Sequence, residues 1–281
     1  MGEKSEDDFS HFEERLEKKL LSHQVILNNQ YCKWFASAEL NLDDVKYFTQ
    51  QFSVFSNLFI VAQLYKTINS VDLQEMRSAK EILANELGCV FHGKENNSEA
   101  DLTYGSDIPE DEEGSNLVNT EGSVDGGTFR FEAAHFEWLL SFAKPLGLKF
   151  EDLGKRKHGS KSTLFFCDEL IRIYGSTDFN ESAGASFAVE NWAAAGFWKQ
   201  LIEGLKRFKK NKFPELPLGF FIWHDKVEDQ HKEHTHDELK ELFFGYHPFS
   251  ENKFIDAGRE MLDGVATFWD GLNQERLQRQ K

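Results

Sequence analysis

The chain of 281 residues carries 32 lysines and arginines against 48 aspartates and glutamates, a formal net charge of -16 at pH 7. A phosphate backbone or an anionic lipid surface repels so acidic a protein, so we expect neither nucleic acid nor membrane partners. The length allows one substantial core with an appendage, and no run approaches the ~18 apolar residues of a membrane-spanning helix.

The cysteines and the start of the chain indicate the compartment. Cys32, Cys89 and Cys167 are odd in number and have no C-x-x-C spacing, which favours neither a disulfide framework nor a zinc knuckle. Residues 1–8 are predicted to form a charged tail, and no apolar segment of a secretory signal follows them. We therefore expect a cytoplasmic protein.

Helical periodicity dominates from Phe9 onward and strand signals are nearly absent, so we predict one all-α domain over residues 9–281. Asn41 and Ser70 are predicted to cap helices, and Gly88 to end one. The high phenylalanine count, 27, is interpreted as a bulky aromatic core. The predicted helices are residues 9–27, from 42 to about 64, 71–87, 128–143, 161–174, 182–209, 218–244 and 250–281.

Residues 92–127 interrupt the helical periodicity with an acidic sequence rich in glycine, serine and asparagine. Such a segment cannot bury enough apolar area to offset its ordering entropy, so we predict a mobile, loop-like insertion.

Two E-x-x-H pairs, Glu132/His135 and Glu228/His231, are candidates for metal binding, because helical residues three apart point to the same side. The spacing alone is weak, since acidic helices produce it by chance. The neighbourhood of the first pair is apolar, and a core histidine bonded to a backbone carbonyl is the alternative for His135.

Glu190 is the sharper signal, because it is the only acid between residues 182 and 201 and has apolar residues at helical spacing around it. An ionised carboxylate there is costly unless it is paired or bound to a cation. The alternative is a neutral acid hydrogen-bonded to a buried group.

The segment His224-x-x-x-Glu228-x-x-His231 offers three ligands within about 60° of one another on one helix face. Its surroundings are polar, so a solvated face with scattered histidines is the alternative, and His234 and His236 are interpreted in that way. With the residues above, the candidate set comprises Glu132, His135, Glu190, His224, Glu228 and His231. Carboxylates and imidazoles without thiolates suit iron or manganese, and helical bundles host such carboxylate-bridged centres.

The order of the candidate ligands along the chain is Glu, His, a lone Glu on a later helix, and then His-x-x-x-Glu-x-x-His. In this order the chain resembles the haem-oxygenase-like di-iron oxidases and oxygenases, relatives of the TenA and PqqC folds. The segments Asn28-Asn29-Gln30-Tyr31 and Asn41-Leu42-Asp43-Asp44 resemble the family's opening helices. The resemblance covers most of the chain apart from the insertion.

Two departures concern the ligands. The family more often has aspartate at the position of Glu228. Some members place the first glutamate near an N-E-L-G-like segment, present here at residues 85–88, so Glu86 competes with Glu132 as first ligand. We favour Glu132, because its spacing from His135 does not depend on the path of the insertion.

The resemblance implies a helical bundle of about seven or eight helices that binds two Fe(II)/Fe(III) ions, with manganese as an alternative, and uses O2 to oxidise a small carboxylate, amine or amino-acid-like substrate. An external reductant is expected and a homodimer is left open. Competing hypotheses are a ferritin-like metal store, a metal-free TenA-type or PqqC-type enzyme, and a haem oxygenase with His23 as axial ligand.

Overall fold

The computed structural model describes residues 4–93, 120–124, 127–131, 135–245 and 249–279, with the backbone alone for residues 90–93, 120–124, 127–131 and 227–237. In this part of the chain the helices in order are α1 (Glu6–Leu16), α2 (Gln24–Leu27), α3 (Gln30–Ser37), α4 (Leu42–Ile68), α5 (Leu73–Leu87), α6 (His135–Ala143), α7 (Lys161–Glu169), α8 (Phe179–Ala193), α9 (Phe197–Lys212), α10 (Gly219–Gly245) and α11 (Glu251–Arg279). The strands are β1 (Cys89–Gly93), β2 (Thr120–Val124) and β3 (Gly127–Phe131).

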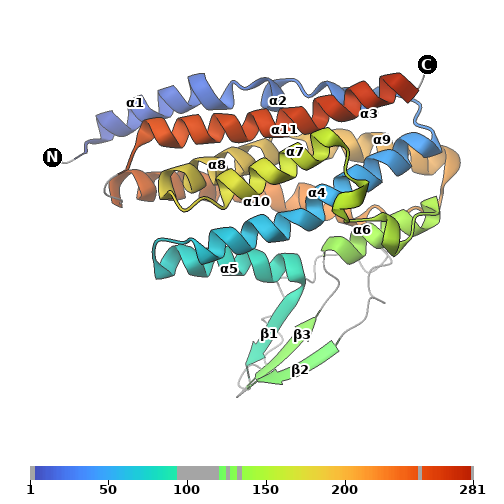
Figure 1. Ribbon diagram of the computed structural model, residues 1–281, viewed down its shortest axis with the longest axis horizontal. Coiled ribbons are helices and arrows are strands. Elements are labelled where there is room, and N and C mark those ends of the chain that lie inside the picture. Colours follow the sequence, from blue (N-terminus) through green and yellow to red (C-terminus); the bar gives the residue numbers. More distant parts are fainter. Residues whose placement is uncertain (1–3, 94–119, 125–126, 132–134, 246–248, 280–281) are drawn as a thin grey trace.

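The long helices run roughly along one axis and form a layered bundle, with α11 beside α1 on one side and α5 on the other (Figure 1). α11 packs against α8, α7 and α3, and α4 packs against α5, α6 and α7. This arrangement confirms the predicted all-α helical bundle. No helix in the described ranges is both long and apolar enough to cross a membrane.

The core is aromatic, as predicted from the phenylalanine content. Side chains from α1, α3, α4, α7, α10 and α11 interlock in tilted and edge-to-face contacts, which add about 0.5–1.5 kcal/mol per pair to the burial of their apolar area. The largest fully buried side chains include Tyr31, Phe48, Phe52, Phe166, Phe221 and Trp269.

Three of the predicted helices differ in the structure. Residues 182–209 form two helices, because Gly196 adopts φ 87° between α8 and α9. The segment after residue 128 continues as a strand to Phe131, and α6 begins at His135. Helix α1 begins at Glu6, inside the predicted charged tail, because Ser5 caps it.

The predicted caps are confirmed in two of three cases. Asn41 accepts from the backbone N–H of Asp44, and Gly88 ends α5 with φ 67°. Ser70 instead donates its hydroxyl to a carbonyl oxygen in α4, and Asp72 caps α5.

The insertion contains a small antiparallel sheet in the order β1-β3-β2. The sheet projects from the bundle near the ends of α5 and α6 (Figure 1). Its strands correct the expectation of a segment without secondary structure. The predicted mobility falls mainly on residues 94–119 and 125–126, which lie outside the described residues.

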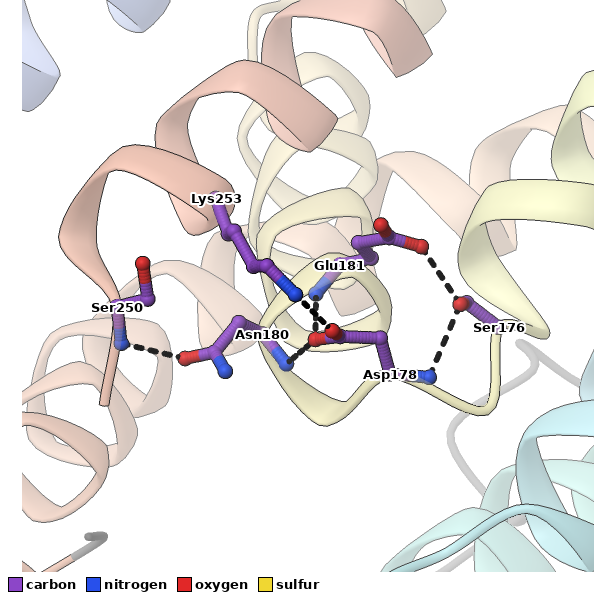
Figure 2. Close-up of polar contacts among 6 residues, drawn as sticks. All are labelled: Ser176, Asp178, Asn180, Glu181, Ser250 and Lys253. Carbon is purple, nitrogen blue, oxygen red and sulfur yellow. Dashed lines mark hydrogen bonds and ion pairs between the residues drawn. The ribbon is translucent and has the colours of Figure 1, made fainter. Parts of the chain in front are cut away.

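The start of α8 is fixed to the start of α11 by polar contacts (Figure 2). Asp178 accepts from the backbone N–H groups of Asn180 and Glu181 at 3.0 and 3.4 Å, and its carboxylate forms an ion pair with Lys253. Asn180 Oδ1 accepts from the backbone N–H of Ser250 at 2.7 Å. These contacts set the position of the helix that carries Glu190.

Candidate metal centre

Glu86 at the end of α5 and His135 at the start of α6 form the centre of the candidate site. Glu86 Oε2 lies 2.9 Å from His135 Nδ1, and their side chains are only 14% and 9% exposed. The pairing of Cys89 with Phe131 between β1 and β3 brings the chain back across the insertion. The small sheet therefore places these two residues together.

His224 of α10 joins this pair. Its ring centroid lies 4.7 Å from that of His135, and Trp198 of α9 stacks on it at 4.7 Å and 25°. His224 Nδ1 lies 2.6 Å from the carbonyl oxygen of Phe220, one turn earlier in the same helix. Because a carbonyl oxygen only accepts, Nδ1 carries the proton and the lone pair of the neutral ring is on Nε2. A histidine held in this way is typical of metal ligands.

Aromatic side chains surround the two imidazoles. Trp223 lies 4.7 Å from the His135 ring and Trp138 lies 5.7 Å from it, both measured between ring centroids. The site thus combines a nearly buried carboxylate, two imidazoles and apolar walls. Such apolar surroundings lower the local dielectric constant and strengthen electrostatic interactions within the site.

Glu190 of α8 is half-buried, and its charge acts on two neighbours of this region. The pKa of Tyr174 is raised well above its usual range, first by burial and then by the charges of Glu190 and Glu86. Burial lowers the pKa of Lys66, and the carboxylates of Glu75 and Glu190 oppose that shift. Glu190 and Glu86 therefore act on the same buried tyrosine.

Tyr174, Gln63 and Lys66 form a buried polar group that the sequence did not indicate. Tyr174 donates to Gln63 Oε1 at 2.7 Å, Gln63 donates to the carbonyl oxygen of Ala79 at 2.8 Å, and Lys66 Nζ lies 4.7 Å from the Tyr174 ring centroid. The group links α4 to α5 and to the π-helical turn Leu170–Tyr174. Only the tertiary fold reveals this group, because its residues lie in helical segments whose sequences contain no distinguishing motif.

The six predicted ligands differ in how far the structure describes them. His135 and His224 come together, and the charge of Glu190 acts on Tyr174, as does that of Glu86. Glu132 lies outside the described residues, as do the side chains of Glu228 and His231, although helix α10 is continuous from Gly219 to Gly245. Among the residues that are described, no group of three or more potential ligands is close enough to hold a metal ion.

Glu86, the alternative to Glu132, contacts His135 directly. The preference for Glu132 rested on a shared helix face with His135, and Glu132 lies outside the described residues. The available signal for Glu86 was the Asn85-Glu86-Leu87-Gly88 segment, which the resemblance had marked.

The cysteines show no sign of reactivity. Burial raises the pKa of Cys167 to about 12 and that of Cys32 well above its usual range, and it also raises that of Cys89. The thiolate is the nucleophilic form, so these thiols are poor nucleophiles at neutral pH. Cys32 and Cys167 are fully buried in the core, where they contribute to packing.

No family model matches the sequence, and no curated protein matches it. Solved structures do match over nearly the whole chain. A CADD-like protein of unknown function from Nostoc punctiforme PCC 73102 is 13% identical with a TM-score of 0.60, covering 97% of this chain and 96% of that chain. A domain of unknown function with a haem-oxygenase-like fold from Shewanella denitrificans OS217 is 14% identical with a TM-score of 0.62, covering 98% and 95%.

A TenA homologue from P. horikoshii OT3 is 13% identical with a TM-score of 0.50, covering 95% of this chain and 97% of that chain. At these identities the comparisons establish the fold alone. The chain has the haem-oxygenase-like fold that the CADD-like and TenA structures share, as the order of its residues predicted.

Proposed function

We propose that this protein is a non-haem metalloenzyme that binds iron, with manganese as the alternative, and uses O2 to oxidise a small carboxylate, amine or amino-acid-like substrate. The observation that carries the proposal is a pair of contacts at His135: Glu86 Oε2 lies 2.9 Å from its Nδ1, and the His224 ring centroid lies 4.7 Å from its own. The haem-oxygenase-like fold supports it as the scaffold on which the resemblance predicts such a centre.

The donors fit such an ion. Carboxylate oxygens and imidazole nitrogens without thiolates suit iron and manganese. We propose that up to two ions are held by Glu86, His135, Glu190, His224, Glu228 and His231, with Glu132 as the alternative to Glu86. The bound metal supplies the one-electron chemistry that O2 activation needs, and an external reductant supplies the electrons.

The protein's own residues prepare this site. The carbonyl oxygen of Phe220 holds the His224 ring in one tautomer, so the ring does not reorient when it binds an ion. Glu86 accepts a hydrogen bond from Nδ1–H of His135, which would orient the imidazole for an ion bound through Nε2. Trp198, Trp138 and Trp223 pack against the imidazoles and reduce their contact with water.

Anaerobic Fe(II) titration with elemental analysis tests the proposal, followed by O2 uptake with panels of carboxylic acids, amines and amino acids. We expect up to two irons per chain and substrate-dependent O2 uptake. His224→Ala should lower iron binding, whereas His11→Ala, at an exposed position of α1, should leave it unchanged. Stoichiometric zinc, or no iron after anaerobic loading, would overturn the proposal. A ferritin-like store would instead accumulate iron beyond two ions and yield no organic product.

A further inference from the structure

The chain has only six tryptophans against 27 phenylalanines. All six are connected to one another through contacts between aromatic rings. Trp138 and Trp223 lie against His135, with 5.4 Å between their own ring centroids. Trp198 stacks on His224. Indole rings are among the side chains most readily oxidised by one electron, so the arrangement of the tryptophans bears on redox chemistry.

A continuous series of ring contacts leads from the candidate metal centre to the opposite side of the bundle. Phe197 lies 4.5 Å from Trp198 and 5.6 Å from Trp269, measured between ring centroids. Tyr31 lies 5.7 Å from Trp269 and 5.3 Å from Trp34. Trp34 is partly exposed, so the series ends at solvent.

The inner rings are suited to passing an electron without losing a proton. The indole N–H groups of Trp192, Trp198 and Trp269 are buried and have no acceptor among the described residues. An oxidised indole that cannot release its N–H proton remains a radical cation, which regains an electron from the next ring instead of persisting as a neutral radical.

The outer end carries a positive charge. The guanidinium of Arg276 lies 4.1 Å from the Trp34 ring centroid. A cation over an aromatic face makes removal of an electron from that ring harder. Once oxidised, Trp34 therefore regains an electron readily. The Arg276 guanidinium also attracts an anionic reductant locally, whereas the net charge of -16 repels it elsewhere.

We propose that Trp198, Trp269 and Trp34, with Tyr31 between the last two, form a relay that carries single electrons from a small anionic reductant of the ascorbate class at Trp34 to the candidate metal centre. The relay rests on the proposed function, because that function supplies the oxidised centre. For each electron the reductant is oxidised by one electron and the centre is reduced by one. Each ring returns to its starting state, and no bond in the rings forms or breaks.

The test maps oxidised aromatic residues by peptide mass spectrometry after Fe(II)-loaded protein meets O2 without substrate. We expect oxidised Trp34 in the wild type and its suppression by ascorbate. In Trp269→Phe, which keeps the ring packing, oxidation at Trp34 should fall several-fold while oxidation at Trp198 rises. Tyr65→Phe is the control, because Tyr65 is 48% exposed on α4 and lies outside this series of rings, and it should leave the distribution unchanged. Circular dichroism checks the folding of both variants.

A metal-free experiment separates failure of the relay from failure of the proposed function. A ruthenium photo-oxidant in solution reaches partly exposed Trp34 but not Trp269, which is 2% exposed. The relay predicts oxidised Trp269 in folded, metal-free protein after brief illumination. Urea-unfolded protein provides the reference for full access. The relay is overturned if Trp269 remains unmodified here while Trp34 is oxidised, or if Trp269→Phe leaves the pattern in the iron-loaded protein unchanged. A protein that binds no iron overturns the proposed function alone.

Discussion

Glu86 Oε2 lies 2.9 Å from His135 Nδ1, and the β1–β3 pairing that closes the insertion brings the two residues together. If Glu86 is a ligand or orients His135, Glu86→Gln should weaken Fe(II) binding by about 10–100-fold, as loss of a group supporting a metal ligand does. Anaerobic titration measures the affinity. Glu81→Gln, at an exposed position on the same helix, is the control.

Glu132→Gln completes that comparison. An unchanged affinity would assign the first carboxylate to Glu86 rather than Glu132. Weakened Fe(II) binding in Glu132→Gln, together with normal binding in Glu86→Gln, would instead assign the first carboxylate to Glu132, as the E-x-x-H spacing predicted.

Glu190→Gln tests the second predicted carboxylate. Glutamine keeps the shape and hydrogen-bonding capacity but removes the anionic donor, so a ligand role predicts weaker Fe(II) binding and loss of the visible absorption of the oxidised centre. A neutral buried acid would tolerate the change. Circular dichroism is the folding control, and unchanged iron binding in a folded variant would remove Glu190 from the site.

Local sequence signals predicted much of the fold correctly. Asn41 and Gly88 acted as cap and terminator because each satisfies backbone groups within its own turn, and such effects depend on few neighbours. The break between α8 and α9 was missed because Ala193, Ala194 and Ala195 favour helix before Gly196 and the helical spacing of apolar residues continues after it. Part of the apolar face assigned to Glu190 consequently belongs to a different helix.

The candidate site could be predicted only in part. The His224 segment lies on one helix, so its spacing alone placed positions 224, 228 and 231 on one face. The contact of Glu86 with His135 depends on strand pairing across an acidic insertion, and such pairing has weak local signals. The Tyr174–Gln63 bond joins two helical segments and likewise has no local pattern.

Tyr174→Phe should destabilise the protein by about 1–3 kcal/mol, because it leaves the buried Gln63 Oε1 without its donor. The contact of Lys66 with the ring face survives in phenylalanine. Urea unfolding measures the change in free energy. Tyr65→Phe, 48% exposed on α4, should stay within about 0.5 kcal/mol of the wild type. Equal stability of the two variants would contradict the assigned role of Tyr174.

Asp178 should make folding pH-dependent at the acidic end. The Lys253 ammonium, followed by the backbone N–H groups of α8, holds the pKa of Asp178 below its usual range. A depressed folded pKa stabilises the protein above the unfolded pKa of about 4, and this contribution is lost as pH falls through the folded pKa. Asp178→Asn keeps the cap but removes the ion pair, a contribution of about 0.2–1 kcal/mol at neutral pH.

Urea midpoints at neutral and acidic pH therefore should differ less in Asp178→Asn than in the wild type. Asp256→Asn, at an exposed position of α11, provides the matched control and should keep the wild-type pH dependence. An identical acid response of all three proteins would exclude a contribution from the Asp178–Lys253 pair.

The crossing of α8 and α11 depends on Gly184, where a Cβ would lie 2.1 Å from the backbone oxygen of Phe254. A backbone atom cannot rotate away as a side chain does, so Gly184→Ala must push the two helices apart and should cost about 1–3 kcal/mol, even though alanine favours helix. Gly219→Ala is the matched control, because nothing lies within 4 Å of its Cβ position at the start of α10, and it should be neutral or stabilising by up to about 1 kcal/mol. Urea unfolding of both variants gives the two free energies. If Gly184→Ala were as stable as Gly219→Ala, the close approach of α8 to α11 would not exist in solution, and the placement of Glu190 relative to the rest of the candidate site would have to be revised.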